Sequence, residues 1–299
     1  IMNYSRIAGL GFYVPETIVS NDDLSQLMDT SDDWITERSG IKQRHFFTEG
    51  VDTVSNMGAK ASKIALERAG LEAHDIDFII FATLSPDYNF PGSGVLLQRE
   101  LPFREIGALD VRNQCSGFIY GLSIADQYIK SGMYKNILLV GSEIHSGGLD
   151  KSTKGRSVSV IFGDGAGAAL LQKTNYGGVL GSWIKSDGRG SEVIQIPAGG
   201  VRIPFGSENF SEEHKYFQMD GRAVWDFAVE AFPEAVNSVL EKVRMDIVDV
   251  DIIIPHQANL RIIEAGMKKL GLNMDKAYTN ICLLYTSDAA DEGLGVDLG

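Results

Sequence analysis

The sequence predicts an α/β protein built from two similar halves with mostly parallel sheets. Small apolar residues at helical spacing over 61–69 are followed by the apolar run 78–82. A similar helical pattern over 227–240 is followed by the apolar run 252–254, and an Asp-x-Asp turn precedes each run. Helices that alternate with continuously apolar strands are typical of parallel sheets covered on both faces. We therefore expect two copies of one βαβ-type unit that meet at a pseudo-twofold centre.

The remaining segments fit the same alternation. Apolar runs predict strands at 7–11, 106–111, 136–140 and 166–171, and helical periodicity predicts helices at 54–68, 119–130 and 262–270. The glycine-rich stretch 163–167 precedes a strand, whereas a nucleotide-binding loop precedes a helix, so we interpret it as a tight turn with close backbone packing. The glycines of 188–204 predict a loop near the mouth of a pocket.

Composition limits the class of protein. The chain has 299 residues, of which 44% are hydrophobic and 22% charged, which suits one large or two medium globular domains. No apolar run approaches the roughly 20 residues that span a bilayer, so we expect a cytoplasmic protein with no membrane partner. A net charge of −13 argues against nucleic acid as a partner. Two cysteines give no disulfide framework, and no Cys/His spacing predicts a metal site, so we expect no cofactor.

Cys115 is the first candidate for catalysis. It stands where the apolar run 106–111 ends and a helical pattern begins. Unpaired N–H groups and the positive dipole end of a helix stabilise a thiolate, so this position favours a nucleophile. Most lone cysteines are instead small buried hydrophobes, and that alternative stays open on the residues alone.

His256 is the second candidate, because it follows the apolar run 252–254 at the point where the chain turns into another helix. The carboxyl ends of strands in open α/β sheets carry ligand-binding and catalytic groups. A histidine there, paired with a helix-terminal cysteine from the other half, suits thioester chemistry. Two local basic clusters could meet an acidic partner: Arg38, Lys42 and Arg44 near Trp34, and Arg261, Lys268 and Lys269 after His256.

Four motifs together resemble the β-ketoacyl-acyl-carrier-protein synthase III family, condensing enzymes of the thiolase superfamily. They are the stretch 30–41 with Trp34, the Cys-Ser-Gly-Phe run at 115–118, Phe-Gly-Asp-Gly-Ala-Gly-Ala at 162–168, and His-Gln-Ala-Asn-Leu-Arg at 256–261. The resemblance implies a thiolase-like fold with two pseudo-duplicated halves, 1–174 and 175–281, in a five-layer α-β-α-β-α arrangement. It also implies a homodimer.

The resemblance further implies roles for individual residues. Cys115 would be the acylated nucleophile, and His256 would polarise the malonyl thioester. Coenzyme A would be held by Trp34, Arg38, Arg156 and Asn259, and the carrier protein by Arg261, Lys268 and Lys269. Phe90 would cross a dimer interface to wall the partner's acyl pocket.

The implied reaction joins an acyl-CoA starter to malonyl-acyl-carrier protein with loss of carbon dioxide, and so initiates fatty acid synthesis. Three alternatives remain. One is a related acyltransferase or condensing enzyme of secondary metabolism, the second is a cysteine thioester hydrolase, and the third is a non-catalytic binding module with the same fold.

The end of the chain departs from the family pattern. A Gly-Asn-Thr-Ser stretch, whose asparagine completes the family's catalytic triad, is expected soon after Asn280 and is not present in the sequence. Residues 282–299 resemble a translated sequencing adapter. We therefore expect a C-terminally truncated fragment with an incomplete second half, a non-native tail at 282–299 and no condensing activity in the chain as written.

Overall fold

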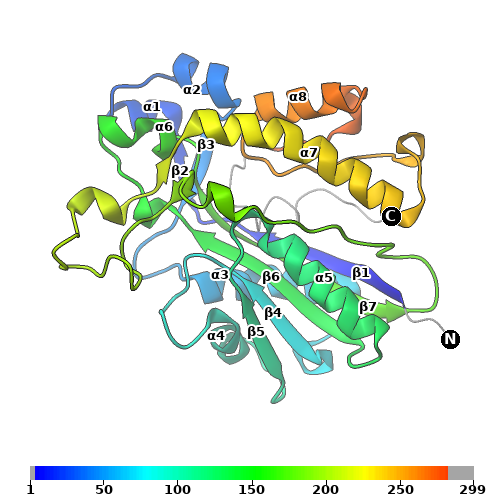
Figure 1. Cartoon of the computed structure of the whole chain (residues 1–299). Helices are drawn as coiled ribbons and strands as arrows, with labels where there is room; N and C mark the ends of the chain where they lie inside the picture. Colours follow the sequence, from blue (N-terminus) through cyan, green and yellow to red (C-terminus); the bar gives the residue numbers. More distant parts are fainter. Residues whose placement is uncertain (1–3, 282–299) are drawn as a thin grey trace.

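A five-stranded sheet lies at the centre of the computed structural model, which describes residues 4–281 (Figure 1). Its strands run in the order β1-β7-β6-β4-β5, with β4 parallel to β5 and β6, and β7 antiparallel to β6 and β1. Their bounds are β1 Tyr4–Tyr13, β4 Phe78–Ala82, β5 Gly107–Val111, β6 Asn136–Ile144 and β7 Asp164–Thr174. The predicted strands of the first half are confirmed, but the sheet is mixed and not mostly parallel, because β7 runs antiparallel to both of its neighbours.

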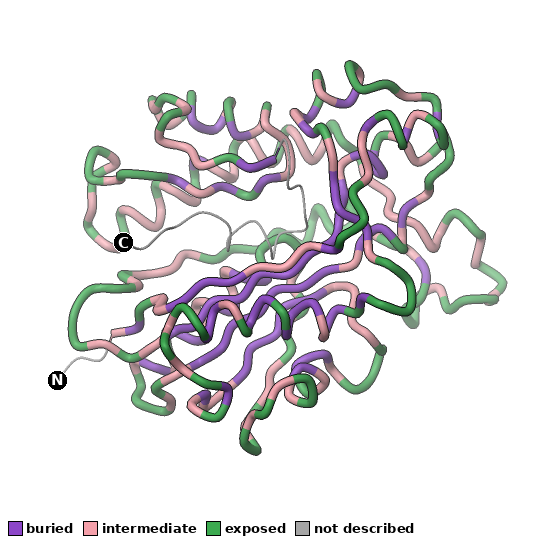
Figure 2. Tube along the Cα trace, turned by 180° about the vertical axis from the view of Figure 1, so that it is seen from behind, coloured by how far each residue is buried: buried purple, intermediate pink, exposed green. Residues whose placement is uncertain are grey.

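Both faces of this sheet are buried, because successive side chains point to opposite faces. Ile79 and Phe81 of β4 pack with helices α3 (Val54–Ala69) and α4 (Ser93–Glu100), whereas Ile80 packs under α5 (Gly117–Lys130). The strands β6 and β7 divide their side chains in the same way. Figure 2 shows this buried core as the continuous run of buried chain through the sheet. An apolar run with no polar face is thus explained by a strand covered on both sides.

Close approach of α3 to β1 depends on glycine. A Cβ placed at Gly11 would lie 2.1 Å from the carbonyl oxygen of Ala61, and one at Gly9 would lie 2.1 Å from that of Ala65. The helix backbone therefore rests directly on the strand, which fixes the position of one covering layer.

The other elements surround this unit. They are β2 (Thr17–Ser20), α1 (Asn21–Ser25), α2 (Asp32–Ser39), β3 (Gln43–Phe46), α6 (Arg156–Ser159), β8 (Ile194–Gln195), β9 (Gln218–Met219), α7 (Gly221–Val243) and α8 (Leu260–Lys269). Single 3₁₀ turns lie at Ala73–Asp75, Gln114–Ser116, Ser146–Gly148, Thr153–Gly155, Gly188–Gly190, Glu212–Lys215, Ile247–Asp249 and Met274–Lys276. The helices α7 and α8 pack on one another in the upper part of Figure 1, beyond α5.

Two predicted elements differ from the structure. Over 252–254 the expected strand is reduced to one parallel bridge between Ile253 and Ala277, so the second sheet is not formed within residues 4–281. The glycine-rich stretch is not a turn either, because Asp164 to Gly167 already belong to β7. Small residues are needed there because β7 lies between β1 and β6 with α3 packed over it. The predicted loop over 188–204 holds a 3₁₀ turn and the two residues of β8.

Candidate active site

Cys115 lies at the carboxyl edge of the sheet. The chain leaves β5 at Val111 and enters a 3₁₀ turn, Gln114–Ser116, that runs directly into α5. Cys115 is exposed, and the preceding Gln114 has a φ of 40°, which is unusual for a residue with a side chain. Such strained positions cluster at functional sites. The predicted placement of the thiol immediately before a helix is confirmed.

His256 is exposed on the segment between the Ile253 bridge and α8. The neighbouring Gln257 is fully buried and fixes this segment. Its amide nitrogen donates to the carbonyl oxygens of Pro255 at 2.8 Å and Tyr278 at 3.1 Å, and its side-chain oxygen accepts from the Asn280 amide at 3.0 Å. Sequence reasoning treated Gln257 only as part of a motif. Hydrogen bonds from the Gln257 side chain therefore hold this segment in place, where we expected pairing between strands to do so.

Two arginine side chains lie close to the indole ring of Trp34. The guanidinium carbon of Arg38 lies 4.4 Å from the indole centroid, and that of Arg156 lies 5.0 Å from it. Arg156 also donates to the carbonyl oxygen of Asp29 and pairs with its carboxylate at 3.6 Å. The residues come from α2 and α6, so the structure brings together three side chains predicted to form one site. An aromatic face flanked by planar donors suits a nucleotide base and its phosphates.

Asn259 joins this cluster to the second half of the chain. Its side-chain oxygen accepts from the Arg261 amide at 2.9 Å and so caps α8, and its amide nitrogen donates to the Arg38 carbonyl at 3.0 Å. The α2 helix therefore contacts the start of α8, close in sequence to His256.

The two predicted basic clusters differ in how far their side chains are exposed and in whether they are already paired. Arg261 and Lys268 are exposed on α8, whereas the Lys269 amine pairs with Glu230 of α7. Arg44 is fully buried, and its guanidinium donates to the Val160 carbonyl at 2.8 Å. Burial lowers the pKa of Arg44 to about 10. Arg44 is therefore part of the core and not of a binding surface.

Phe90 lies on the loop between β4 and α4, and its side chain is 90% exposed. The nearby β5 strand is an edge strand within the described residues, since it pairs there with β4 alone. An exposed aromatic side chain beside an open strand edge is a feature of interaction surfaces.

A buried polar cluster at the same edge of the sheet escaped sequence reasoning. Glu143 and His145 come at the end of β6, with Nε2 of the histidine 3.5 Å from the carboxylate. Asp164 is fully buried and accepts from the amides of His145 at 2.7 Å and Phe47 at 2.7 Å. Burial raises the pKa of Asp164, and hydrogen bonds from Ser146 and Phe47 oppose that rise. Only the aspartate inside the glycine-rich motif signalled this cluster.

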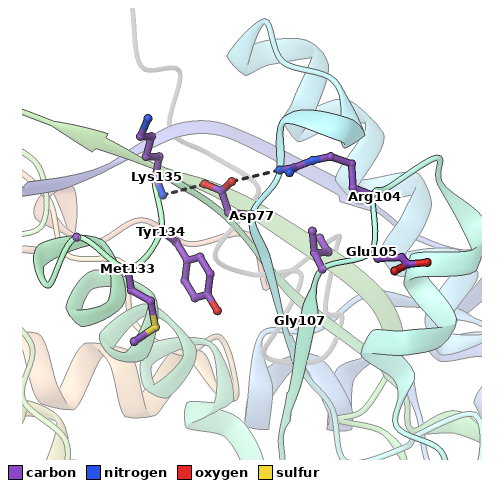
Figure 3. Close-up of a pocket in the computed structure, with 9 residues that line it drawn as sticks. Asp77, Arg104, Glu105, Gly107, Met133, Tyr134 and Lys135 are labelled. Atoms are coloured by element: carbon purple, nitrogen blue, oxygen red, sulfur yellow. Dashed lines mark hydrogen bonds and ion pairs between the residues drawn. The ribbon is translucent and has the colours of Figure 1, made fainter.

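A pocket of about 480 Å³ lies at the opposite edge of the sheet (Figure 3). Asp77 lies in it, accepting from the Lys135 and Asn136 amides at 2.9 and 3.0 Å and pairing with Arg104 at 3.2 Å. These contacts connect the segments that enter β4, β5 and β6. The pocket is at the amino ends of the parallel strands, so it is separate from the edge that carries Cys115.

No helix within 4–281 combines the length and apolar character needed to cross a membrane. No group of three or more His, Cys, Asp or Glu side chains in the same range could hold a metal ion.

A cysteine before a helix at the carboxyl edge of an α/β sheet, with a separate aromatic–cationic cluster, suits an enzyme that transfers acyl groups through a cysteine. Comparisons with known proteins agree. A model described as 3-oxoacyl-[acyl-carrier-protein] synthase III matches residues 109–188, and its C-terminal counterpart matches residues 240–289. The β-ketoacyl-[acyl-carrier-protein] synthase III of Caldanaerobacter subterraneus is 42% identical over 97% of this chain and 87% of its own. The chain belongs to the 3-oxoacyl-[acyl-carrier-protein] synthase III family.

Two further relatives extend this result. The enzyme of the same name from Neisseria meningitidis serogroup A is 41% identical over 100% of this chain and 91% of its own. The crystal structure of 3-oxoacyl-[acyl-carrier-protein] synthase III from Aquifex aeolicus superimposes with a TM-score of 0.87 at 36% identity, covering 97% of this chain and 88% of that one. The fold is therefore the predicted thiolase-like α/β fold.

The predicted truncation and adapter-derived tail find no support in these comparisons. The C-terminal family match continues to residue 289, and the Neisseria alignment includes the whole chain. Residues 282–299 lie outside the described residues, as does any position for the expected asparagine after Ile281.

Proposed function

We propose that this protein condenses an acyl-CoA starter with malonyl-acyl-carrier protein through an acyl-Cys115 intermediate, giving the 3-ketoacyl-acyl-carrier protein that initiates fatty acid synthesis. The observation that carries the proposal is the exposed thiol on a strained turn before α5, in a member of this family. No cofactor other than the thioester substrates is required by this scheme.

In the first half-reaction the Cys115 sulfur attacks the acyl-CoA carbonyl, and the carbon–sulfur bond to coenzyme A breaks. Backbone N–H groups at the start of α5 are suited to the developing oxyanion, because they are the donors that a helix leaves unpaired. The proton lost by the Cys115 thiol passes to the leaving sulfur, so coenzyme A leaves as a thiol and the acyl group remains on the enzyme.

In the second half-reaction the malonyl thioester loses its carboxylate as carbon dioxide, and the electron pair of the broken bond forms an enolate. The His256 imidazole stabilises the enolate oxygen by a hydrogen bond. The enolate carbon attacks the acyl-Cys115 carbonyl, and the cysteine sulfur leaves as a thiolate. Decarboxylation replaces a strong base, so no carboxylate is needed at the centre.

The coenzyme A part of the starter and the carrier protein of the malonyl substrate would bind to residues other than Cys115 and His256. Trp34, Arg38 and Arg156 would hold the adenine and phosphates of coenzyme A, with Asn259 along the pantetheine arm. The exposed Arg261, with Lys268 and Lys269, would receive the acidic carrier protein, although Lys269 already has Glu230 as a partner.

A homodimer is part of the proposal. Phe90 is 90% exposed beside the open edge of β5, and both features suit a second copy of the chain that adds its own β5 and receives Phe90 in its acyl pocket. A monomer in size-exclusion chromatography with light scattering would contradict this part.

The sequence after Ile281 does not contain the Gly-Asn-Thr-Ser stretch that carries the family's catalytic asparagine. We propose that the chain as written carries out the first half-reaction on Cys115, and that the condensation described above needs the family stretch as well. Resequencing the source locus across codon 281 tests whether residues 282–299 belong to the gene, and a chain carrying the family stretch should regain condensation if they do not.

The reaction is tested by mass spectrometry of the protein after incubation with a panel of acyl-CoAs. Acylation of Cys115 that malonyl-carrier protein discharges to a 3-ketoacyl product supports the condensing role. Rapid hydrolysis of acyl-Cys115 without malonyl thioester would favour a thioester hydrolase, and a thiol that resists both acylation and alkylation would favour a binding module.

A further inference from the structure

We propose that Glu143, Asp87 and Asp110 are positioning residues that hold the loop carrying Phe90, and thereby set which starter acyl groups the enzyme accepts. This inference rests on the proposed function, in which Phe90 walls an acyl pocket. The 83–93 loop connects β4 to α4, with Phe90 on its exposed part.

Glu143 holds the first part of the 83–93 loop. One carboxylate oxygen accepts from the Leu84 amide at 2.7 Å. The other accepts from the Ser85 amide at 3.1 Å, the Ser85 hydroxyl at 2.5 Å and the Thr83 hydroxyl at 3.3 Å. The Glu143 side chain is 6% exposed, and Nε2 of His145 lies 3.5 Å from this second oxygen. A buried carboxylate with this many donors fixes the backbone of the loop to the end of β6.

Asp87 holds the middle of the loop. One of its carboxylate oxygens accepts from the Ser55 amide at 3.2 Å and the Ser55 hydroxyl at 3.1 Å. The other accepts from the Ser93 hydroxyl at 2.8 Å. The loop is therefore tied to the first turn of α3 and folded back onto its own end.

Asp110 holds the end of the loop. Its two carboxylate oxygens accept from the Ser93 amide at 2.6 Å and the Gly94 amide at 2.9 Å. Asp110 belongs to β5, and a Cβ at Gly92 would lie 2.6 Å from its carboxylate, so the loop backbone touches the edge strand. Phe90 stands between these attachments, exposed on a loop whose two ends are fixed. A rigid loop loses little conformational entropy when its aromatic tip enters a pocket. It also fixes how far the Phe90 ring reaches into that pocket.

Amide substitutions test the positioning role sharply. In Glu143→Gln or Asp110→Asn, each side-chain terminal atom still faces a backbone N–H, so either orientation of the new amide sets an NH₂ group against a donor. The loop must shift while the size of each side chain is kept. The matched control is Asp52→Asn, because Asp52 is also buried but its carboxylate has its partners in Thr48, Tyr13 and Lys60, which lie outside the loop.

The readout is the rate constant for acylation of Cys115 by acetyl-CoA relative to that by hexanoyl-CoA. In the proposed scheme this first half-reaction uses Cys115 and does not use the family's asparagine. We expect Phe90→Ala, Glu143→Gln and Asp110→Asn to change the ratio about tenfold or more, since a displacement of about 1 Å can cost up to 100-fold. Asp52→Asn should lower the melting temperature and leave the ratio unchanged.

Three outcomes separate the possibilities. A wild-type protein that neither thioester acylates overturns the proposed function itself. Normal wild-type acylation, with Glu143→Gln and Asp110→Asn ratios that match Asp52→Asn, overturns the positioning role alone. A Phe90→Ala variant with an unchanged ratio also overturns it.

Mixed dimers test whether the loop acts across the interface. In a dimer with one Cys115→Ser protomer, only the other protomer can be acylated. Glu143→Gln placed in the Cys115→Ser protomer should then shift the ratio. A shift seen only when Glu143→Gln is in the acylated protomer would contradict action across the interface.

Discussion

Replacing Asn259 perturbs two contacts whose energies can be separated. The Asn259 side chain caps α8 through the Arg261 amide at 2.9 Å and ties α8 to α2 through the Arg38 carbonyl at 3.0 Å. Loss of an N-cap costs about 1 kcal/mol, and loss of a neutral hydrogen bond costs about 1 kcal/mol. Asn259→Ala should therefore lower the free energy of unfolding by about 2 kcal/mol.

Asn259→Asp isolates the second contact, because aspartate caps a helix as well as asparagine does but has no donor for the Arg38 carbonyl. It should cost about 1 kcal/mol. Both variants should also raise the Kd for coenzyme A, since Arg38 and Trp34 on α2 lose their tie to α8. Urea unfolding followed by tryptophan fluorescence gives the stabilities, and calorimetric titration gives the affinities. An Asn259→Asp protein with wild-type stability and wild-type affinity would refute the link between the two helices.

Three further changes have defined outcomes. Gly11→Ala should destabilise the protein by about 3 kcal/mol in thermal unfolding, because its Cβ would lie 2.1 Å from the Ala61 carbonyl. Trp34→Leu keeps an apolar side chain against the cluster that contains Ile35 and Ile41 but has no ring for the guanidinium groups, so the Kd for coenzyme A should rise about tenfold. Asp164→Asn should cost about 1–3 kcal/mol, since its NH₂ group would face backbone or hydroxyl donors in either orientation.

The Asp164 variant also has a pH signature. Burial raises the pKa of Asp164, so between the ordinary aspartate value and the raised value the folded state binds more protons than the unfolded state. The wild-type advantage over Asp164→Asn is then complete below the ordinary pKa and decreases as pH rises through the raised one. Urea unfolding from about pH 4 to pH 7 measures this trend. An advantage that grows with pH would contradict it, and wild-type behaviour of Gly11→Ala or Trp34→Leu would contradict the other two predictions.

The first half of the fold was predictable because its strands are short apolar runs buried on both faces, and such runs separated by helical patterns are a local signal. Cys115 was predictable for the same reason, since the end of a strand and the start of a helix can be read from neighbouring residues. The segment near His256 was not, because Ile253 pairs with Ala277 across the sequence and the buried Gln257 clamp replaces a ladder of strand pairs.

Long-range polar contacts account for the other differences. Glu143 binds a loop almost 60 residues earlier, and Asn259 contacts a carbonyl separated from it by 221 positions. Neither contact is indicated by a periodic pattern of residues in the sequence. Arg44 was read as a surface cation from its basic neighbours, whereas its burial depends on the Val160 carbonyl from a distant segment. Hydrogen bonds between a side chain and a backbone group far away in sequence cannot be predicted from the pattern of neighbouring residues.

The central claim is that Cys115 carries the acyl group, and intact-protein mass spectrometry after incubation with acetyl-CoA tests it most directly. The account predicts a mass increase of one acetyl group on the wild-type protein, located at Cys115 by peptide mapping and absent from Cys115→Ser. A wild-type protein that stays unmodified with every acyl-CoA offered, or one acylated equally in Cys115→Ser, would contradict the account.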